Sequence, residues 1–261
     1  MDFELIQRTA VAAAYDGGRV LRQYFGKLIQ IKKKGNIDLF TQADLDSEQA
    51  IIKTIRKKFP DHGFISEETG RTSDKKAAQW IVDPLDGTTN YVHGIALFAI
   101  SIAFSLNNEI KIGVVFNPFL AELFTAVKSY GAQLNGQPIK VSSTKSIAKC
   151  ILATGFPYNF ETSLRPIIRR FQQCLSACQG IRQLGSAALD LCYVACGRFD
   201  GFWEQNFSPW GMAAGSLIAH EAGAKITDFS NQLYNIDKKE ILVSNSHIHE
   251  ELISLLRVKD R

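Results

Sequence analysis

Residues 80–90 read Trp-Ile-Val-Asp-Pro-Leu-Asp-Gly-Thr-Thr-Asn, an apolar run that leads into two acids and a turn. The apolar run predicts a strand that ends at Asp83, because Pro84 cannot continue a regular sheet. Asp83 and Asp86 then lie at a strand end, where the turn also offers the backbone carbonyl of Leu85. Mg²⁺ prefers such oxygen ligands, so we expect all three groups to bind metal, with Asp83 placed to bridge two ions.

The next residues, Gly87, Thr88 and Thr89, predict a phosphate site beside these acids. A helix that starts here would direct exposed N–H groups and a positive dipole end at a phosphate. Asp-Pro and Asp-Gly also occur in ordinary turns that bind nothing. Two acids, two threonines and a glycine around one strand end are more than a turn requires, so the pattern favours metal and phosphate binding.

A second strand-like segment, residues 63–66, leads into the adjacent acids Glu67 and Glu68. Adjacent like charges repel each other unless a cation or solvent separates them. We therefore expect one of the two to be a metal ligand and the other to be solvated.

The composition indicates a globular protein with a sizeable core, since 46% of the 261 residues are hydrophobic. The formal net charge of +4 is too modest to indicate nucleic-acid binding. No apolar run approaches the ~20 residues of a membrane span, and the first residues lack the pattern of a secretory signal. We expect a cytoplasmic protein without membrane contact.

The cysteines do not form a redox or zinc motif, because none of them has C-x-x-C spacing. Cys174 and Cys178, like Cys192 and Cys196, are four residues apart, so each pair shares a helix face where a metal or disulfide is conceivable. Both pairs lie in helical stretches rich in Ala and Leu. Reduced cysteines that pack as small hydrophobes are the favoured interpretation.

Hydrophobic periodicity divides the chain into two parts with different patterns. A helix is expected over residues 3–25, and a second helix starts at Thr41 with Asp44 in a capping-box position. Strands with turn signals follow up to residue 141 and indicate a mostly antiparallel sheet. From about residue 148 strands and helices alternate. We expect a layered α/β sandwich with subdomains 1–147 and 148–261, the first carrying most metal ligands and the second the substrate contacts.

The sequence resembles the inositol monophosphatase family, and the likeness extends over nearly the whole chain. The most specific segment is Asp-Pro-Leu-Asp-Gly-Thr-Thr-Asn-Tyr-Val-His-Gly at residues 83–94. Further agreement comes from residues 38–44, 65–68 and 185–190. The resemblance implies a layered αβαβα sandwich of the sugar-phosphatase type, dependence on two or three Mg²⁺ ions, inhibition by lithium and a homodimer.

The resemblance also implies a role for individual residues. Metal would be held by Glu67, Asp83, the Leu85 carbonyl and Asp86, with Glu67 also touching a water near the phosphorus. Asp44 and Thr88 would activate the attacking water, while the backbone N–H groups of Gly87 and Thr88 would hold phosphate. Asp86, Ala187 and Glu204 would contact the substrate, and Lys33 would lie near the entrance.

One position departs from the family pattern, in which Trp-Asp occurs near residue 210. Here Trp210 is followed by Gly211, which supplies no carboxylate for the second metal. Since losing even indirect metal partners costs roughly 10- to 100-fold in affinity or activity, we expect weakened but not necessarily abolished catalysis.

The favoured function is Mg²⁺-dependent hydrolysis of inositol 1-phosphate without a covalent phosphoenzyme. A first alternative is hydrolysis of another sugar or nucleotide phosphate, because fold-level likeness does not determine the substrate. A second is a non-catalytic partner of transcription or RNA-processing machinery, suggested by Gly211, by the positive charge and by bacterial members of the family.

Overall fold

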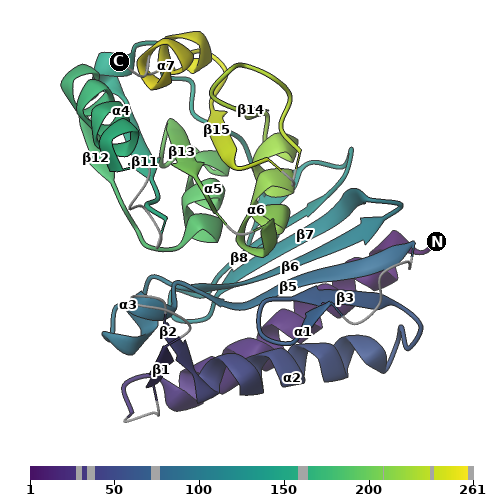
Figure 1. The fold of residues 1–261 in the computed structure, drawn as a ribbon. Helices are drawn as coiled ribbons and strands as arrows, with labels where there is room; N and C mark the ends of the chain where they lie inside the picture. Colours follow the sequence, from purple (N-terminus) through teal and green to yellow (C-terminus); the bar gives the residue numbers. More distant parts are fainter. Residues whose placement is uncertain are drawn as a thin grey trace.

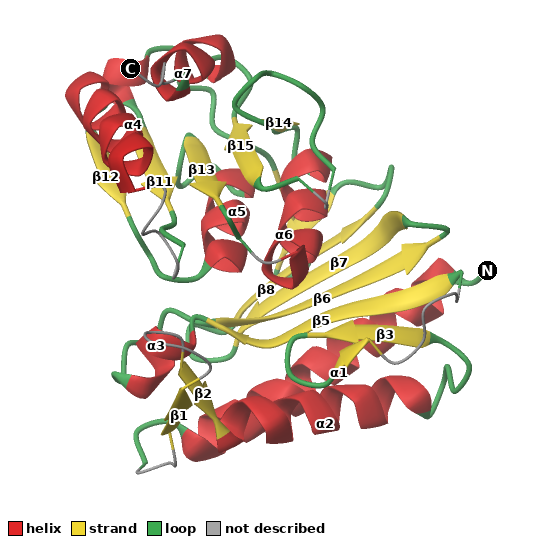
Figure 2. Cartoon of the chain, in the orientation of Figure 1, coloured by secondary structure: helices red, strands yellow, loops and turns green. Residues whose placement is uncertain are grey.

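The computed structural model describes residues 1–27, 31–33, 39–71, 77–157, 164–207, 209–235 and 238–257. Within these ranges helices and sheets are stacked in the order α, β, α, β, α (Figures 1 and 2). This is the layered α/β sandwich that the sequence and the family resemblance predict. None of the helices in these ranges is long and apolar enough to cross a membrane.

The first two layers come from the N-terminal half. Helices α1 (Phe3–Tyr24) and α2 (Gln42–Arg56) pack beneath an eight-stranded sheet (Figure 1). Its strand order is β10-β9-β8-β7-β6-β5-β3-β4, and only the β3–β5 pair is parallel. The strands are β3 (Gly63–Ser66), β4 (Gly70–Arg71), β5 (Ala78–Asp86), β6 (Ala99–Leu106), β7 (Glu109–Asn117), β8 (Glu122–Val127), β9 (Ala132–Leu134) and β10 (Gln137–Ile139). A small ribbon of β1 (Ile31–Lys33) and β2 (Leu39–Thr41) precedes α2, and the short helix α3 (Thr88–Val92) follows β5.

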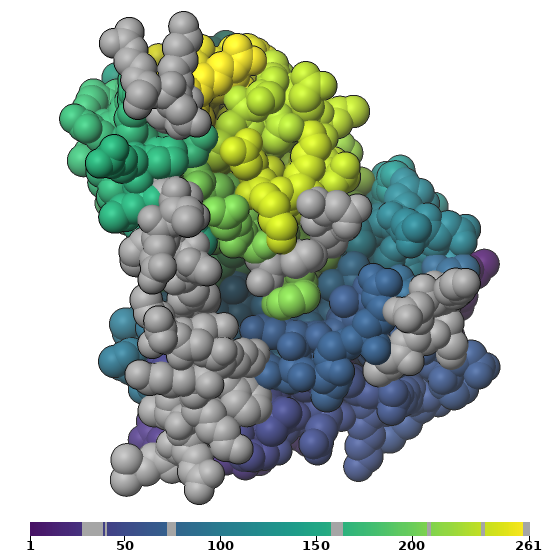
Figure 3. Space-filling view, viewed as in Figure 1, coloured from purple at the N-terminus to yellow at the C-terminus, as the bar shows by residue number. Residues whose placement is uncertain are grey.

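The other layers come from the C-terminal half, whose atoms lie above the first half in Figure 3. Helices α5 (Ala187–Ala195) and α6 (Pro209–Glu221) lie between the large sheet and a second, five-stranded sheet, and α4 (Leu164–Ala177) and α7 (His249–Leu256) form the outer layer (Figure 1). The second sheet has the order β12-β11-β13-β15-β14, and a 3₁₀ turn (Ile147–Lys149) precedes it. Its strands are β11 (Ile151–Thr154), β12 (Gly180–Arg182), β13 (Gly201–Gln205), β14 (Lys225–Thr227) and β15 (Glu240–Ser244).

Side-chain size along β6 explains how the two halves approach each other. Ile100, Ile102 and Phe104 are large and pack into the cluster shared with α1 and α2. The alternate residues, which include Ala99 and Ala103, are small and face the cluster shared with α5 and α6. A strand that is buried on both faces reads as a nearly continuous buried run, as β6 does. The small face allows a helix to lie close to the sheet.

Several local expectations are confirmed. Asp2 caps α1, and Thr41 with Asp44 forms the capping box that starts α2. Two of the turns between the expected strands lie at Asn107 and Asn135, which have positive φ angles of 53° and 50°. The expected end of β5 is wrong in detail: the strand continues past Pro84 to Asp86, because a register shift between Asp83 and Asp86 removes Pro84 from the regular ladder.

The two sheets fall on opposite sides of the predicted boundary at residues 147 and 148. One hydrophobic cluster nevertheless includes residues from both halves, such as Ala103 of β6 and Ala214 of α6. The division into subdomains 1–147 and 148–261 therefore stays a prediction about folding units.

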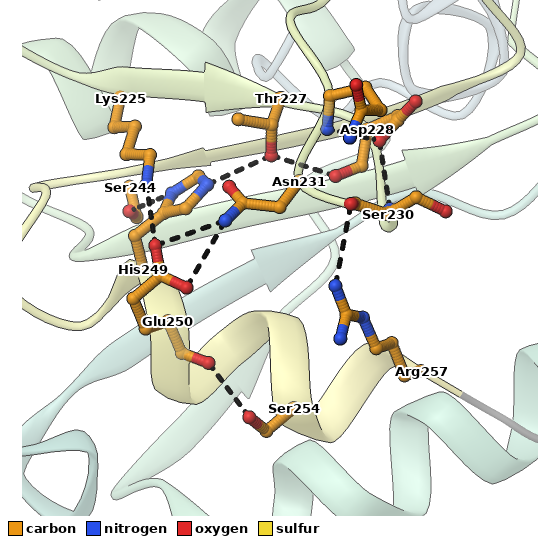
Figure 4. Close-up of polar contacts among 11 residues, drawn as sticks. Lys225, Thr227, Asp228, Ser230, Asn231, Ser244, His249, Glu250, Ser254 and Arg257 are labelled. Carbon is orange, nitrogen blue, oxygen red and sulfur yellow. Dashed lines mark hydrogen bonds and ion pairs between the residues drawn. The ribbon is translucent and has the colours of Figure 1, made fainter.

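The outer helix α7 is attached to the second sheet by a buried histidine (Figure 4). The two ring nitrogens of His249 lie 2.8 Å from the Ser244 hydroxyl and 2.9 Å from the Thr227 hydroxyl. Burial, with a smaller contribution from Lys225, lowers the pKa of His249 from 6.5 to about 4. The neutral ring is thus built into the junction of α7, β14 and β15.

We predict that His249 makes stability depend on acid. Because its folded-state pKa lies below its unfolded-state value, its stabilising contribution is complete above pH 6.5 and is lost as pH falls towards 4. From about pH 7 to about pH 5 this loss is roughly 2 kcal/mol of unfolding free energy. Urea unfolding should show a flatter pH dependence for His249→Gln. Exposed His247 provides the control, and a His249→Gln profile parallel to that of His247→Gln would contradict the prediction.

Candidate metal and phosphate site

A cavity of about 280 Å³ lies where the two halves meet, and it contains most of the predicted site residues. The N-terminal half contributes the ends of β3 and β5 and the start of α3. The C-terminal half contributes the starts of α5 and α6 and the end of β13. The residues with charged or predicted roles that line it are Glu67, Asp83, Leu85, Asp86, Gly87, Thr88, Ala187, Asp190, Glu204 and Gly211.

The β5 irregularity brings two acids to the same cavity. Asp83 pairs with Ser101 on β6 and Asp86 pairs with Ala99, with the register shift between these pairs. Both carboxylates face Gly211 on α6, where a Cβ would lie 3.6 Å from Asp83 Oδ2 and 3.8 Å from Asp86 Oδ1. The sequence predicted that this strand ends at Asp83. Instead, the strand is irregular between Asp83 and Asp86, and both acids face α6.

Burial and neighbouring negative charges raise the pKa values of Asp83 and Asp86. Burial first, and then the negative charges of Glu67 and Asp86, raise the pKa of Asp83 well above its usual range. Burial raises the pKa of Asp86 to about 6, although hydrogen bonds from the second half lower it. Such raised values are expected where carboxylates lie together without a neutralising cation.

Asp86 is held by the opposite half of the molecule. Its Oδ2 accepts hydrogen bonds from the Ser186 hydroxyl at 2.6 Å and from the Ala188 backbone N–H at 2.8 Å. Its other oxygen is the one that faces Gly211. Ser186 is a site residue that sequence reasoning missed. Its position before α5 carried a signal, because a serine that caps a helix has an oriented hydroxyl.

A second polar group connects α2 with the start of α3. The Thr88 hydroxyl lies 3.3 Å from Asp44 Oδ1 and 3.0 Å from the Leu85 carbonyl. The other Asp44 oxygen accepts the Thr41 backbone N–H at 2.9 Å in the capping box. Asp44 is 2% exposed, so a fixed carboxylate orients the threonine hydroxyl from within the core.

The predicted phosphate-binding turn has no space for a side chain at Gly87. Gly87 has a φ of 96°, and a Cβ there would lie 3.0 Å from the carbonyl oxygens of Gly185 and Leu97. Glycine is therefore required both by conformation and by space. The turn leads directly into α3, as the sequence predicted.

The far wall of the cavity contains two buried acids. Among the described residues, Glu204 Oε2 and Asp190 Oδ1 are buried atoms without a hydrogen-bond partner. Burial, followed by the charge of Asp86, raises the pKa of Glu204 to about 8, and burial followed by the charge of Glu204 raises that of Asp190 well above its usual range. A Cβ at Gly155 would overlap the Glu204 carboxyl group. Sequence reasoning included Asp190 in a family motif but gave it no role.

The remaining predicted residues differ in how the structure places them. Ala187 opens α5 and lines the cavity. Lys33 lies in β1, but its side chain is outside the described part of the chain. Of the predicted site residues, Asp44 does not line the cavity, and it reaches the site through Thr88.

The donor set fits a hard divalent cation. Carboxylates from Glu67, Asp83 and Asp86, with the Leu85 carbonyl, are oxygen ligands of the kind that Mg²⁺ takes. Within the described ranges no three acidic, histidine or cysteine side chains already have the spacing of a bound-metal cluster. Since the negative charges of Glu67 and Asp86 raise the pKa of Asp83, a cation would be needed to draw the three carboxylates closer.

Comparisons with known proteins identify the family to which the chain belongs. The Inositol monophosphatase family pattern matches residues 2–260. An inositol-1-monophosphatase from Synechocystis sp. is 39% identical over 98% of this chain and 90% of its own length. The Nus factor SuhB of Pasteurella multocida is 38% identical over 95% of this chain and 94% of its own length. The crystal structure of the extragenic suppressor protein suhB from Bartonella henselae covers 98% of this chain and 100% of its own, with a TM-score of 0.94 and 38% identity. By this match in sequence and fold, the chain belongs to the inositol monophosphatase family.

Proposed function

We propose that this protein hydrolyses inositol 1-phosphate to inositol and phosphate with the help of Mg²⁺. The observation that carries the proposal is the single cavity in which Glu67, Asp83 and Asp86 lie beside the oriented hydroxyl of Thr88. The name of the Synechocystis relative supports the substrate. A cytoplasmic location, a homodimer and inhibition by lithium are further proposals that rest on family membership.

Each part of the cavity has a task in this proposal. Glu67, Asp83, Asp86 and the Leu85 carbonyl would hold two or three Mg²⁺ ions. When bound, these ions neutralise phosphoryl oxygens and lower the pKa of a water. Thr88, oriented by Asp44, would accept that water's hydrogen bond and direct the water at phosphorus.

The substrate would be held by backbone and carboxyl groups. The N–H groups of Gly87 and Thr88 suit a phosphate, because they stand at the start of α3 and glycine adds no side chain there. Ala187 and Glu204 would contact the hydroxyl groups of the inositol ring. Glu204 Oε2 has no hydrogen-bond partner within the described ranges, so a polyol hydroxyl could supply one. Lys33 would attract the anionic substrate at the entrance.

The direct test is phosphate release from inositol 1-phosphate in Mg²⁺ and in EDTA. Fructose bisphosphate and nucleotide 3′-phosphates in the same assay distinguish the favoured substrate from related phosphate esters. Faster turnover of one of these would replace inositol 1-phosphate in the proposal. No Mg²⁺-dependent release from any of them would reject the phosphatase function.

A second candidate function is a protein partner role in transcription. The Nus factor SuhB names of relatives from Pasteurella multocida and Haemophilus influenzae favour it, as does Gly211 in place of an acidic ligand. Binding of this protein to purified RNA polymerase and its elongation factors, unaffected by Asp83→Asn, would support a role apart from catalysis.

We predict that Asp83→Asn lowers kcat/KM for inositol 1-phosphate by at least about 100-fold, because a neutral amide cannot balance the charge of the Mg²⁺ that the carboxylate would hold. The folded-state pKa of Asp83 is raised, so its ionised form costs stability that increases as pH rises. The variant should therefore have a higher Tm than the parent in EDTA at neutral pH. Asp61→Asn, at an exposed acid outside the cavity, is the control. Near-normal turnover of Asp83→Asn would remove this residue from the mechanism.

Thr88→Ala should lower kcat by at least about 10-fold while changing KM little. The substitution deletes the hydroxyl next to Asp44 but keeps the backbone N–H that is proposed to hold phosphate. Steady-state kinetics on Thr54→Ala, which removes a hydroxyl that donates to Asp16 at 2.7 Å away from the cavity, provide the comparison. A change in KM alone would show that Thr88 binds substrate and does not orient water.

Gly211→Asp should raise kcat/KM by about 10-fold or more and tighten Mg²⁺ binding. A Cβ at this position makes only ordinary contacts with the oxygens of Asp83 and Asp86, so the side chain can enter the cavity. An acid in the first turn of α6 also suits the helix dipole. Without metal the added charge repels its neighbours, so the Tm gain should appear mainly in Mg²⁺.

Gly211→Asn separates charge from shape in this experiment, because it adds nearly the same atoms without the carboxylate. Kinetics and Tm are measured for the parent and both variants across a Mg²⁺ series. Equal turnover of the parent and Gly211→Asp at every Mg²⁺ concentration would mean that the glycine costs nothing in catalysis.

A further inference from the structure

Glu48 is a buried acid in the middle of α2 that accepts hydrogen bonds from the turn after β3. One carboxylate oxygen accepts the Ser66 hydroxyl and, at 3.0 Å, the Glu68 backbone N–H. The other accepts the Thr69 backbone N–H at 3.1 Å. All three donors surround Glu67, the predicted metal ligand.

Burial makes these bonds consequential. Glu48 is 1% exposed and Ser66 is 2% exposed, so water cannot easily replace a lost partner. A carboxylate can accept all three bonds because it has about four lone-pair positions and no proton of its own. Apolar or amide side chains of similar size cannot do the same.

The backbone of Glu67 is also fixed from the opposite side. Its N–H donates to the Val82 carbonyl at 3.2 Å and so extends the pairing of β3 with β5. Glu48 then fixes the two residues that follow. Between these anchors the Glu67 side chain lines the cavity together with Asp83.

Glu48 belongs to a polar face of α2 that holds two segments of the site. Asp44, Ser47 and Glu48 are three and four residues apart, which places them on one side of a helix. Asp44 contacts Thr88, and the Ser47 hydroxyl donates to the Pro84 carbonyl at 3.0 Å. Asp44 and Ser47 therefore contact the segment from the end of β5 to the start of α3, and Glu48 contacts the turn after β3.

We infer that Glu48 is a positioning residue, which holds the Glu67 turn beside Asp83 so that the Glu67 carboxylate can join the metal site. The inference rests on the proposed function, since it assigns Glu48 a part in the same metal site. Glu48 itself is not among the residues that line the cavity in the described part of the chain, so it acts through the turn and does not touch substrate.

The test compares Glu48→Gln with the parent in Mg²⁺ binding by calorimetry. An amide keeps one acceptor oxygen and turns an N–H₂ group towards a backbone N–H, so at least one of the three bonds is lost. We expect Mg²⁺ affinity to fall by about 10- to 100-fold. In hydrogen exchange, the amides of Glu68 and Thr69 should exchange faster, while the amides of α1 are unchanged.

Asp200 offers a matched control. It is buried, and its carboxylate accepts the Ser142 hydroxyl and the Ile151 backbone N–H at 2.8 Å, just before β13 and away from the cavity. Asp200→Asn should lower Tm to a similar extent but leave Mg²⁺ affinity within about twofold of the parent. A merely structural role for Glu48 predicts the same outcome for both variants.

The possible results separate the inference from the proposed function. Mg²⁺ affinity of Glu48→Gln within about twofold of the parent would overturn the inference. If Glu48→Gln does not fold, Ser66→Ala removes one donor and should still weaken Mg²⁺ binding by about threefold or more, and a smaller change overturns the inference. If the parent binds no Mg²⁺, the proposed function fails. In that case hydrogen exchange still tests the inference: if the Glu68 and Thr69 amides exchange at the parent's rate in Glu48→Gln, or in Ser66→Ala where Glu48→Gln does not fold, Glu48 is not the anchor of the turn.

Discussion

The close approach of α6 to the large sheet is the constraint on which the site depends. A Cβ at Gly113 of β7 would lie 2.7 Å from the Ala214 carbonyl oxygen, so only glycine allows this distance. The Ser101 hydroxyl of β6 donates to the Trp210 carbonyl at 3.4 Å at the start of the same helix. Because α6 lies so close, its first turn closes the cavity over Asp83 and Asp86. A larger residue on this face of the sheet would separate the halves and open the carboxylate cluster.

That junction brings together charges that destabilise one another. Asp83 and Asp86 are repelled by Glu67, while Glu204 and Asp190 are buried without full hydrogen bonding in the described structure. Such an arrangement costs folding free energy and is typical of sites that bind a cation or a polar ligand. Rigid surroundings maintain it, since Asp86 is held by α5 across the junction and Asp44 is held by its own capping box. The strain is concentrated where the proposed chemistry occurs.

Gly211 distinguishes this chain from the family pattern, which has an aspartate at this position in the first turn of α6. A side chain at this position would point towards Asp83 and Asp86. Glycine therefore avoids the repulsion that a third carboxylate would add. The same absence removes a ligand that the family pattern supplies. If the proposed metal site is right, we expect this protein to fold more easily without metal and to hold a second ion less tightly than members with an acid at this position. This balance is compatible with the two kinds of names among its relatives, inositol-1-monophosphatase and Nus factor SuhB.

Features set by neighbouring residues could be predicted from the amino-acid sequence, and features set by distant residues could not. The capping box of Thr41 and Asp44 and the glycine turn at Gly87 depend on contacts between residues a few positions apart. Their sequence patterns were therefore enough to predict them. The pairing of Ser186 with Asp86 joins residues 100 positions apart, and that of Glu48 with Glu68 joins residues 20 apart. These contacts exist only after two sheets and three helix layers have packed, since packing alone decides which buried donors meet which acceptors. Even the path of β5 beyond Pro84 was decided by its partner strand, because β6 supplies pairing on both sides of the irregularity.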